Sequence, residues 1–242
     1  MRPTFAAAAA LALACCLDVA HANTEKAIFL GPETVNVPTT PPTIEDLRLD
    51  VLTPDNWNKR LKLKASFPTR DSPLGATTWL IVTNLTQGQR YELRVCWAAT
   101  QPTAFTLDVF ELSTVWGTPK LISSLADDAF SRQSEQVDSG NSDKPSKRRT
   151  HEYEASLLFV RVQAAADYFT DNATLMTQVE PVSVDLILDP FLLNALPRSL
   201  LPTVGYVVVV AILAWFLSIR ILVWIQPVLA AEGKSAKRKK RM

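Results

Sequence analysis

The sequence predicts a mainly β domain followed by one C-terminal transmembrane helix. Several segments before residue 190 alternate polar and apolar residues with a period of two, which is typical of strands that bury one face. By contrast, residues 200–219 form an uncharged run rich in Val, Leu and Ile. As a helix, about 20 such residues cross the roughly 30 Å hydrocarbon core of a bilayer.

Residues 23–199 are expected to form a single antiparallel β-sandwich similar to an immunoglobulin or fibronectin type III domain. Segments rich in turn-forming residues, such as 84–88 and 100–103, separate the predicted strands. Two segments, 77–83 and 157–163, are more uniformly apolar and suit central strands. The alternating segments are residues 47–51, 61–67, 89–97, 105–109 and 182–188.

One segment of this domain breaks the strand pattern. Residues 127–150 are rich in Ser, Asp, Gln, Lys and Arg, and almost nothing apolar follows Phe130. Such a composition buries too little apolar surface to order itself, so we expect a flexible loop between strands. Sustained three-four spacing is not found before residue 200, so no helix is predicted there.

The N-terminus has the features of a cleaved secretory signal. Arg2 precedes an apolar run over residues 5–17, and the small residues Ala20 and Ala22 close it. We expect cleavage between Ala22 and Asn23, which removes residues 1–22. An uncleaved anchor would need a longer apolar run.

The basic residues that follow the apolar run orient the chain. Residues 232–242 carry six Lys or Arg against one Glu, and the positive-inside rule places such a cluster in the cytosol. Residues 23–199 would then be lumenal in a single-pass type I protein of the endoplasmic reticulum. A basic tail also excludes a GPI-attachment signal, which ends in its hydrophobic stretch. The cluster would favour anionic membrane lipid weakly.

Lys239 and Lys240 stand fourth and third from the carboxyl end of the sequence. This spacing resembles the dilysine retrieval signal, which a vesicle coat reads when it returns membrane proteins to the endoplasmic reticulum. A plain stop-transfer cluster is the alternative interpretation.

Arg220 interrupts an apolar stretch that continues to about residue 231. It would either extend its side chain to the cytosolic interface or meet a polar group on another membrane protein. Gly205 and Ala214 are small enough to permit close approach of a neighbouring helix, although such residues are also common membrane filler. We therefore treat these three residues as candidate partner contacts.

Modification and cysteine chemistry follow from the lumenal assignment. Asn84-Leu85-Thr86 and Asn172-Ala173-Thr174 match the N-glycosylation pattern. Cys96 is the one cysteine left after signal cleavage, so no intramolecular disulfide can form in the mature chain. We expect it to be buried and inert, because its neighbours are apolar.

The sequence offers no catalytic constellation. His151 is the one histidine of the mature chain and lies beside the predicted loop, which suits neither a catalytic triad nor zinc ligation. The glycines are few and form no phosphate-binding loop. The near-neutral lumenal part gives no reason to expect nucleic-acid binding. We therefore expect no catalytic residue, cofactor or metal, which suits a subunit, chaperone or receptor.

Several strings resemble the fungal GPI mannosyltransferase II co-activator family. These are residues 23–32, 52–54, 78–80, 84–86 and 89–103. The resemblance implies a non-catalytic partner of the multi-spanning enzyme that adds the second mannose to the GPI precursor. It implies no catalytic residues in this chain.

Two other classes share this layout of domain, span and tail. A cargo receptor similar to the p24 proteins would need a lumenal cysteine pair and a helix of heptads before the membrane, and neither is found in this sequence. A translocon-associated subunit is the third alternative.

Overall fold

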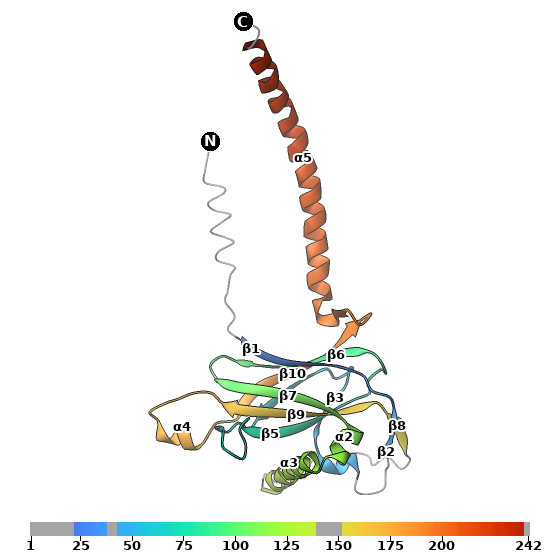
Figure 1. Ribbon diagram of the computed structural model, residues 1–242, viewed down its shortest axis with the longest axis vertical. Helices are drawn as coiled ribbons and strands as arrows, with labels where there is room; N and C mark the ends of the chain where they lie inside the picture. Colours follow the sequence, from blue (N-terminus) through green and yellow to red (C-terminus); the bar gives the residue numbers. More distant parts are fainter. Residues whose placement is uncertain (1–21, 38–42, 139–151, 240–242) are drawn as a thin grey trace. The chain divides into compact units, whose positions relative to one another are not determined.

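The computed structural model describes residues 22–37, 43–138 and 152–239 (Figure 1). The chain divides after Asn194 into two units, and each is described by itself. The first unit is β-rich and the second contains the long C-terminal helix. Most of the predicted signal peptide, residues 139–150 of the predicted loop, His151 and Lys240 lie outside the described residues.

Four strands of the first unit form an antiparallel sheet. They lie side by side in the order β1 (Ala22–Leu30), β6 (Arg90–Ala98), β10 (Val182–Leu192) and β4 (Asn58–Leu63). The pairing of β1 with β6 runs over all of β1, from Ala22 opposite Ala98 to Leu30 opposite Arg90.

A second sheet has the strand order β3 (Asp50–Leu52), β5 (Ala76–Thr83), β9 (Leu157–Ala166) and β7 (Thr103–Glu111). Its pairs are antiparallel except for β3 with β5, which are parallel. A short ribbon pairs β2 (Val35–Val37) with β8 (Tyr153–Ala155). The remaining elements of this unit are η1 (Ile44–Leu47), α2 (Leu112–Gly117), α3 (Pro119–Asp138) and α4 (Ala173–Thr177).

One hydrophobic core is shared by the two sheets. Tyr91, Leu93 and Val95 of β6 are almost completely buried, as their alternation with charged residues predicts. They belong to the same cluster as Leu80 and Val160 of the second sheet. The prediction of a mainly β domain with antiparallel sheets is therefore confirmed. Its likeness to immunoglobulin or fibronectin type III domains stays a prediction.

The second sheet is buried on both faces. Leu80 and Val82 of β5 enter the core shared with the first sheet, whereas Trp79 and Ile81 enter a second core. That second core is closed by side chains of α2 and α3, which include Val115 and Leu121. Burial on two faces explains why residues 77–83 are uniformly apolar, so their prediction as a central strand is confirmed.

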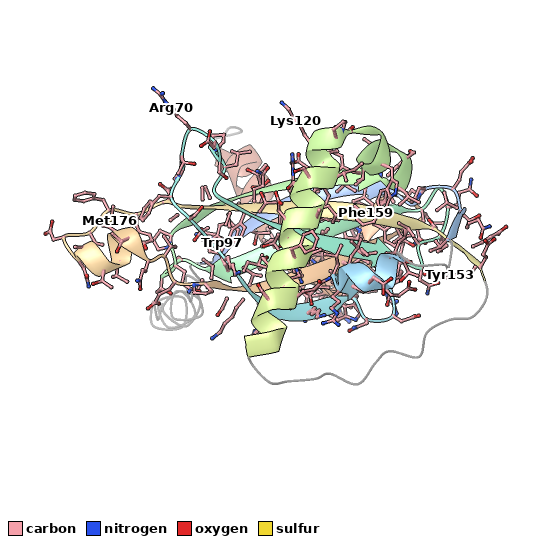
Figure 2. All side chains as sticks on the ribbon, turned by 90° about the horizontal axis from the view of Figure 1, so that it is seen from below. Arg70, Trp97, Lys120, Tyr153, Phe159 and Met176 are labelled. Carbon is pink, nitrogen blue, oxygen red and sulfur yellow. The ribbon has the colours of Figure 1, made fainter. Side chains whose placement is uncertain are left out.

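The prediction of a flexible loop over residues 127–150 is wrong for residues 127–138, which form the end of α3. The prediction of no helix before residue 200 is also wrong, because α2, α3 and α4 are helices. Leu121, Leu125 and Ala129 are all buried and recur at four-residue intervals, so they share one face of the helix. Figure 2 shows α3 lying across the strands near Phe159. A narrow apolar stripe is sufficient for this helix, because only one face contacts the sheet.

The second unit consists of β11 (Leu196–Pro197), η2 (Arg198–Leu200) and α5 (Leu201–Lys239). Residues Arg198–Gln226 are long and apolar enough to cross a membrane, with a mean hydropathy of 2.5, and none of this window is buried. This confirms the apolar C-terminal helix. The helix passes through Arg220 without a break.

Candidate interaction site

A cavity of about 730 Å³ opens beside Trp116, the last large side chain of α2. Half of Trp116 is exposed (51%), and its ring lies 5.5 Å from that of buried Phe159. The lining combines the segment before β2 with η1, α2 and the start of β9. The lining residues are Pro32, Glu33, Val35, Thr43, Ile44, Leu47, Glu111, Leu112, Ser113, Trp116 and Leu157.

A smaller hollow of about 150 Å³ shares Leu47 and Trp116 with this cavity. It adds Ile122, Leu125 and Ala126 from α3. Because both hollows meet at the same two side chains, we describe them together as the Trp116 groove. Most of its surface is apolar, and Ile122 is 41% exposed. An exposed Trp in an apolar hollow is typical of a protein-binding surface.

The groove depends on α3, which polar contacts bind to the second sheet. Asp128 accepts a hydrogen bond from the backbone N–H of Trp79 (3.2 Å), and Arg132 donates one to the carbonyl of Trp79 (3.0 Å). Arg132 also bridges to Asp128 at 2.9 Å and to Asp50 of β3 at 2.8 Å. Lys59 completes the set with a contact of 2.6 Å to Asp50. These interactions hold the helix that forms one wall of the groove.

Asp50, Asp128 and Arg132 of this cluster have pKa values shifted by burial and by their partners. Burial opposes ionisation of Asp50, but hydrogen bonds from Lys59 and Arg132 outweigh it and hold its pKa below the ordinary value. For Asp128, burial exceeds the attraction of Arg132 and raises the pKa. The pKa of Arg132 is raised: its burial acts the other way, but hydrogen bonds and charge from both carboxylates prevail.

The groove offers more for binding than for catalysis. Its polar groups include two carboxylates, Glu33 and Glu111, and two hydroxyls. Of these hydroxyls, Thr43 is buried and accepts a hydrogen bond from the backbone of Asp46. Among the residues that the structure describes, no group of three or more His, Cys, Asp or Glu could hold a metal ion. The arrangement suits apolar side chains with a basic group near the carboxylates.

Both predicted glycosylation sites are exposed. Asn84 follows β5 with a left-handed backbone (φ 60°), and its neighbour Leu85 is buried. Asn172 caps α4 by accepting a hydrogen bond from the backbone N–H of Thr174 (3.0 Å). Cys96 was expected to be buried, but it is only partly buried on β6. The hydroxyl of Thr24 lies 3.5 Å from its sulfur.

The predicted membrane contacts do not share one face of α5. In a helix of 3.6 residues per turn, Ala214 follows Gly205 by about two and a half turns and so lies opposite to it. Arg220 follows Gly205 by slightly more than four turns and lies about 60° from it. A methyl group added at Gly205 would meet no atom of the described chain within 4 Å.

The other predicted site residues are only partly described. Ala22 and Asn23 begin β1, so the predicted cleavage point lies at the start of a paired strand. Lys239 is the last residue of α5, and Lys240 is outside the described residues.

The sequence analysis did not predict the Trp116 groove. The repeat of Leu121, Leu125 and Ala129 was the one pattern that could have indicated α3, the helix that forms one wall of the groove.

Comparisons with known proteins point in one direction. The profile of a family described as GPI-Mannosyltransferase II co-activator matches residues 13–221. A GPI mannosyltransferase 2 subunit of Schizosaccharomyces pombe is 34% identical over 59 residues, which cover 24% of this chain and 33% of that protein. The match thus spans about a third of the relative's length. No solved structure matches the chain significantly.

Proposed function

Because this chain belongs to the GPI-mannosyltransferase II co-activator family, we propose that it is the non-catalytic subunit of the enzyme that adds the second mannose to the GPI precursor. The observation that carries this proposal is the family match over residues 13–221, which includes the β-rich unit and most of the apolar helix. The Trp116 groove supports the proposal, because an exposed Trp in an apolar hollow is typical of a protein-binding surface.

The proposed topology is that of a type I protein of the endoplasmic reticulum membrane. Residues 1–22 are the cleaved signal, residues 23–199 a lumenal domain of the immunoglobulin or fibronectin type III class, and residues 232–242 a cytosolic tail. In this topology Lys239 and Lys240 form a retrieval signal for the vesicle coat. Asn84 and Asn172 become N-glycosylation sites, and their exposure supports this assignment.

The span begins near Leu200 in this proposal. At 1.5 Å per residue, a helix that starts there travels about 30 Å before it reaches Arg220. Arg220 therefore stands at the cytosolic boundary, where its long side chain reaches the headgroups at little cost. The remaining turns of α5 continue into the cytosolic interface, with Trp224 as an anchor. The continuous helix beyond Arg220 supports this arrangement.

The catalytic subunit is proposed to pack against the face of α5 that carries Gly205. The described chain makes no use of the space beside Gly205, since a methyl group there would meet nothing within 4 Å. Glycine is among the poorest helix formers in water, and in membrane helices it permits close approach of a neighbouring backbone. Arg220 lies about 60° from Gly205 around the helix, at the cytosolic end of the span, where its side chain reaches the headgroups. Ala214 lies on the opposite face of the helix and contacts lipid in this proposal.

The Trp116 groove is the proposed lumenal contact. A multi-spanning enzyme has lumenal loops, and a loop with apolar side chains and a basic residue would match the lining and the carboxylates Glu33 and Glu111. With one contact in the membrane and one in the lumen, the second is favoured by the high effective concentration that the first creates.

Co-purification tests the proposal. The tagged full-length chain, recovered in mild detergent from microsomes, is expected to bring down the multi-spanning mannosyltransferase. Depletion of the chain is expected to accumulate GPI precursor with a single mannose. A p24-like cargo receptor would instead recover vesicle-coat components and cargo with normal GPI intermediates. A translocon-associated subunit would recover the translocon.

A further inference from the structure

Leu193 is an unusual residue in the turn directly after β10. Its side chain is 99% exposed, and its backbone is left-handed with φ 51°. The next residue, Asn194, is also left-handed with φ 56°. Two consecutive positive φ angles are the signature of a tight turn that normally takes Asn, Asp or Gly at both positions. Asn194 fits this requirement, whereas Leu193 does not.

The turn is held in place by the side chain of Asn194. Its carbonyl oxygen accepts a hydrogen bond from the backbone N–H of Arg90 (2.8 Å). Its amide group donates one to the backbone carbonyl of Gly88 (2.9 Å). These bonds connect the end of β10 to the loop before β6 and maintain the left-handed backbone. The turn therefore holds Leu193 in an exposed position. Both its positive φ and its exposed apolar side chain are energetically unfavourable in water.

Other exposed apolar side chains accompany it. Leu192 is 40% exposed, and Leu30 at the end of β1 is 55% exposed. Leu30 is the strand partner of Arg90, whose guanidinium lies 5.8 Å from the ring centre of Phe191. Leu30, Arg90, Leu192, Leu193 and Asn194 thus form one region at this end of the first sheet, which we name the Leu193 corner.

The position of the corner in the chain indicates what covers it. Leu193 precedes Leu201, the first residue of α5, by eight residues. Even fully extended, that stretch spans at most about 28 Å. An α5 that enters the bilayer at Leu201 therefore limits Leu193 to at most about 28 Å from the membrane surface, so the corner is within reach of the lipid. Exposed aliphatic side chains beside an arginine suit the boundary between lipid headgroups and acyl chains.

We propose that the Leu193 corner inserts into the lumenal leaflet of the membrane, with Leu193 as the main anchor and Arg90 at the phosphate level. This contact fixes the orientation of the β-rich unit toward the bilayer, which a single helix cannot do alone. The proposal rests on α5 as a membrane span, and it does not require the mannosyltransferase. The exposure of Leu193 is then explained, because the bilayer removes its side chain from water.

Lipid quenching in nanodiscs tests the proposal. The full-length chain with Cys96→Ser carries a second change, Leu193→Cys, and an environment-sensitive fluorophore at the new thiol. It is reconstituted without any partner into phosphatidylcholine nanodiscs that contain lipid spin-labelled near the headgroup. Phe169→Cys in the same background is the matched control, because Phe169 is 85% exposed and distant in sequence from α5. We expect several-fold stronger quenching at position 193 than at position 169.

Equal quenching at both positions would overturn the proposal. If the fluorophore at position 193 is shielded from water only after the mannosyltransferase is added, the proposal is also overturned, in favour of a protein contact. A chain that fails to enter the nanodisc would contradict the span on which the proposal rests. Each of these results is distinct from failure of the co-activator function, which nanodiscs without enzyme do not measure.

A second variant tests Leu193 itself. Leu193→Asp keeps a residue that tolerates the left-handed backbone but places a charge at the tip. With the probe moved to Leu30→Cys, we expect Leu193→Asp to reduce quenching clearly without lowering the thermal midpoint of the chain. Unchanged quenching at position 30 would contradict the role of Leu193 as the anchor.

Discussion

Arg132 of α3 lies 2.8 Å from the carboxylate of Asp50 on β3, a contact between residues that are 82 positions apart. The same guanidinium binds Asp128 of its own helix and the carbonyl of Trp79. This single side chain therefore joins a helix, an edge strand and a central strand. It also supports one wall of the Trp116 groove, so its loss should affect stability and binding together.

Arg132→Ala is expected to destabilise the β-rich unit. The change removes an ion-pair partner of Asp128 and one of the two partners of Asp50, which keeps Lys59. Removing one member of a buried ion pair costs about 3 kcal/mol. Thermal unfolding of the purified chain in detergent measures the effect. Arg60→Ala is the control, because Arg60 pairs with Asp185 at the surface and is 78% exposed. Equal midpoints for the two variants would contradict this account.

Asp50→Asn is expected to change the pH dependence of stability. Because the folded pKa of Asp50 is lowered, its ionised form contributes stability above its ordinary pKa of 3.8. This contribution is lost as the pH falls through the lowered folded value. The variant should therefore be less stable than the parent at pH 7, and the difference should shrink below about pH 4. Unfolding midpoints from pH 7 to pH 3 measure it, and a constant difference would contradict the prediction.

Trp116→Ala should weaken recovery of the mannosyltransferase while the chain stays folded. Half of Trp116 is exposed beside the cavity, and exposed Trp residues are typical binding hot spots with losses of about 2 kcal/mol or more. Quantitative co-purification measures the effect. Phe169→Ala is the matched control, since Phe169 is more exposed and does not line the groove. Similar recovery for both variants would remove the groove from the proposal.

Gly205→Leu and Ala214→Leu separate the two faces of α5. If the catalytic subunit packs against Gly205, a bulky residue there should reduce co-purification, whereas the same residue at Ala214 should be tolerated. Both variants add apolar volume and place a good helix former at the substituted position, so membrane insertion is preserved. A loss confined to Ala214→Leu would place the interface on the opposite face.

Asn84→Gln and Asn172→Gln should each remove one glycan. The full chain from microsomes is expected to migrate faster by one step for each change, and the double variant should no longer respond to glycosidase. Thr86→Ala and Thr174→Ala are the matched controls, because they destroy the acceptor pattern and leave the asparagine in place. Unshifted mobility of all variants would contradict glycosylation at these sites, and with it the lumenal orientation would lose support.

The parts of the fold that could be predicted are those where burial imposes a regular pattern. Residues 89–97 alternate because β6 buries one face, and residues 77–83 are apolar because β5 is buried on both. β1 was missed because its exposed side chains include Ile28 and Leu30, which blur the alternation. The end of α3 was missed because its stripe is narrow and polar residues surround Asp128 and Arg132.

The candidate sites were predictable to different degrees. Short local patterns identified Asn84 and Asn172, and the structure places both at the surface. The Trp116 groove could not be found in this way, because its lining comes from segments between Pro32 and Leu157 that only the fold brings together. The strain at Leu193 was equally hidden, since a positive φ at Leu contradicts the usual preference of that residue.

The most direct test of the central claim combines two measurements on cells that express the tagged chain. The tagged full-length chain is purified from microsomes, and GPI precursors are analysed before and after its depletion. The account predicts recovery of the multi-spanning mannosyltransferase and accumulation of precursor with a single mannose. Recovery of coat components and cargo with unchanged GPI precursors would contradict it.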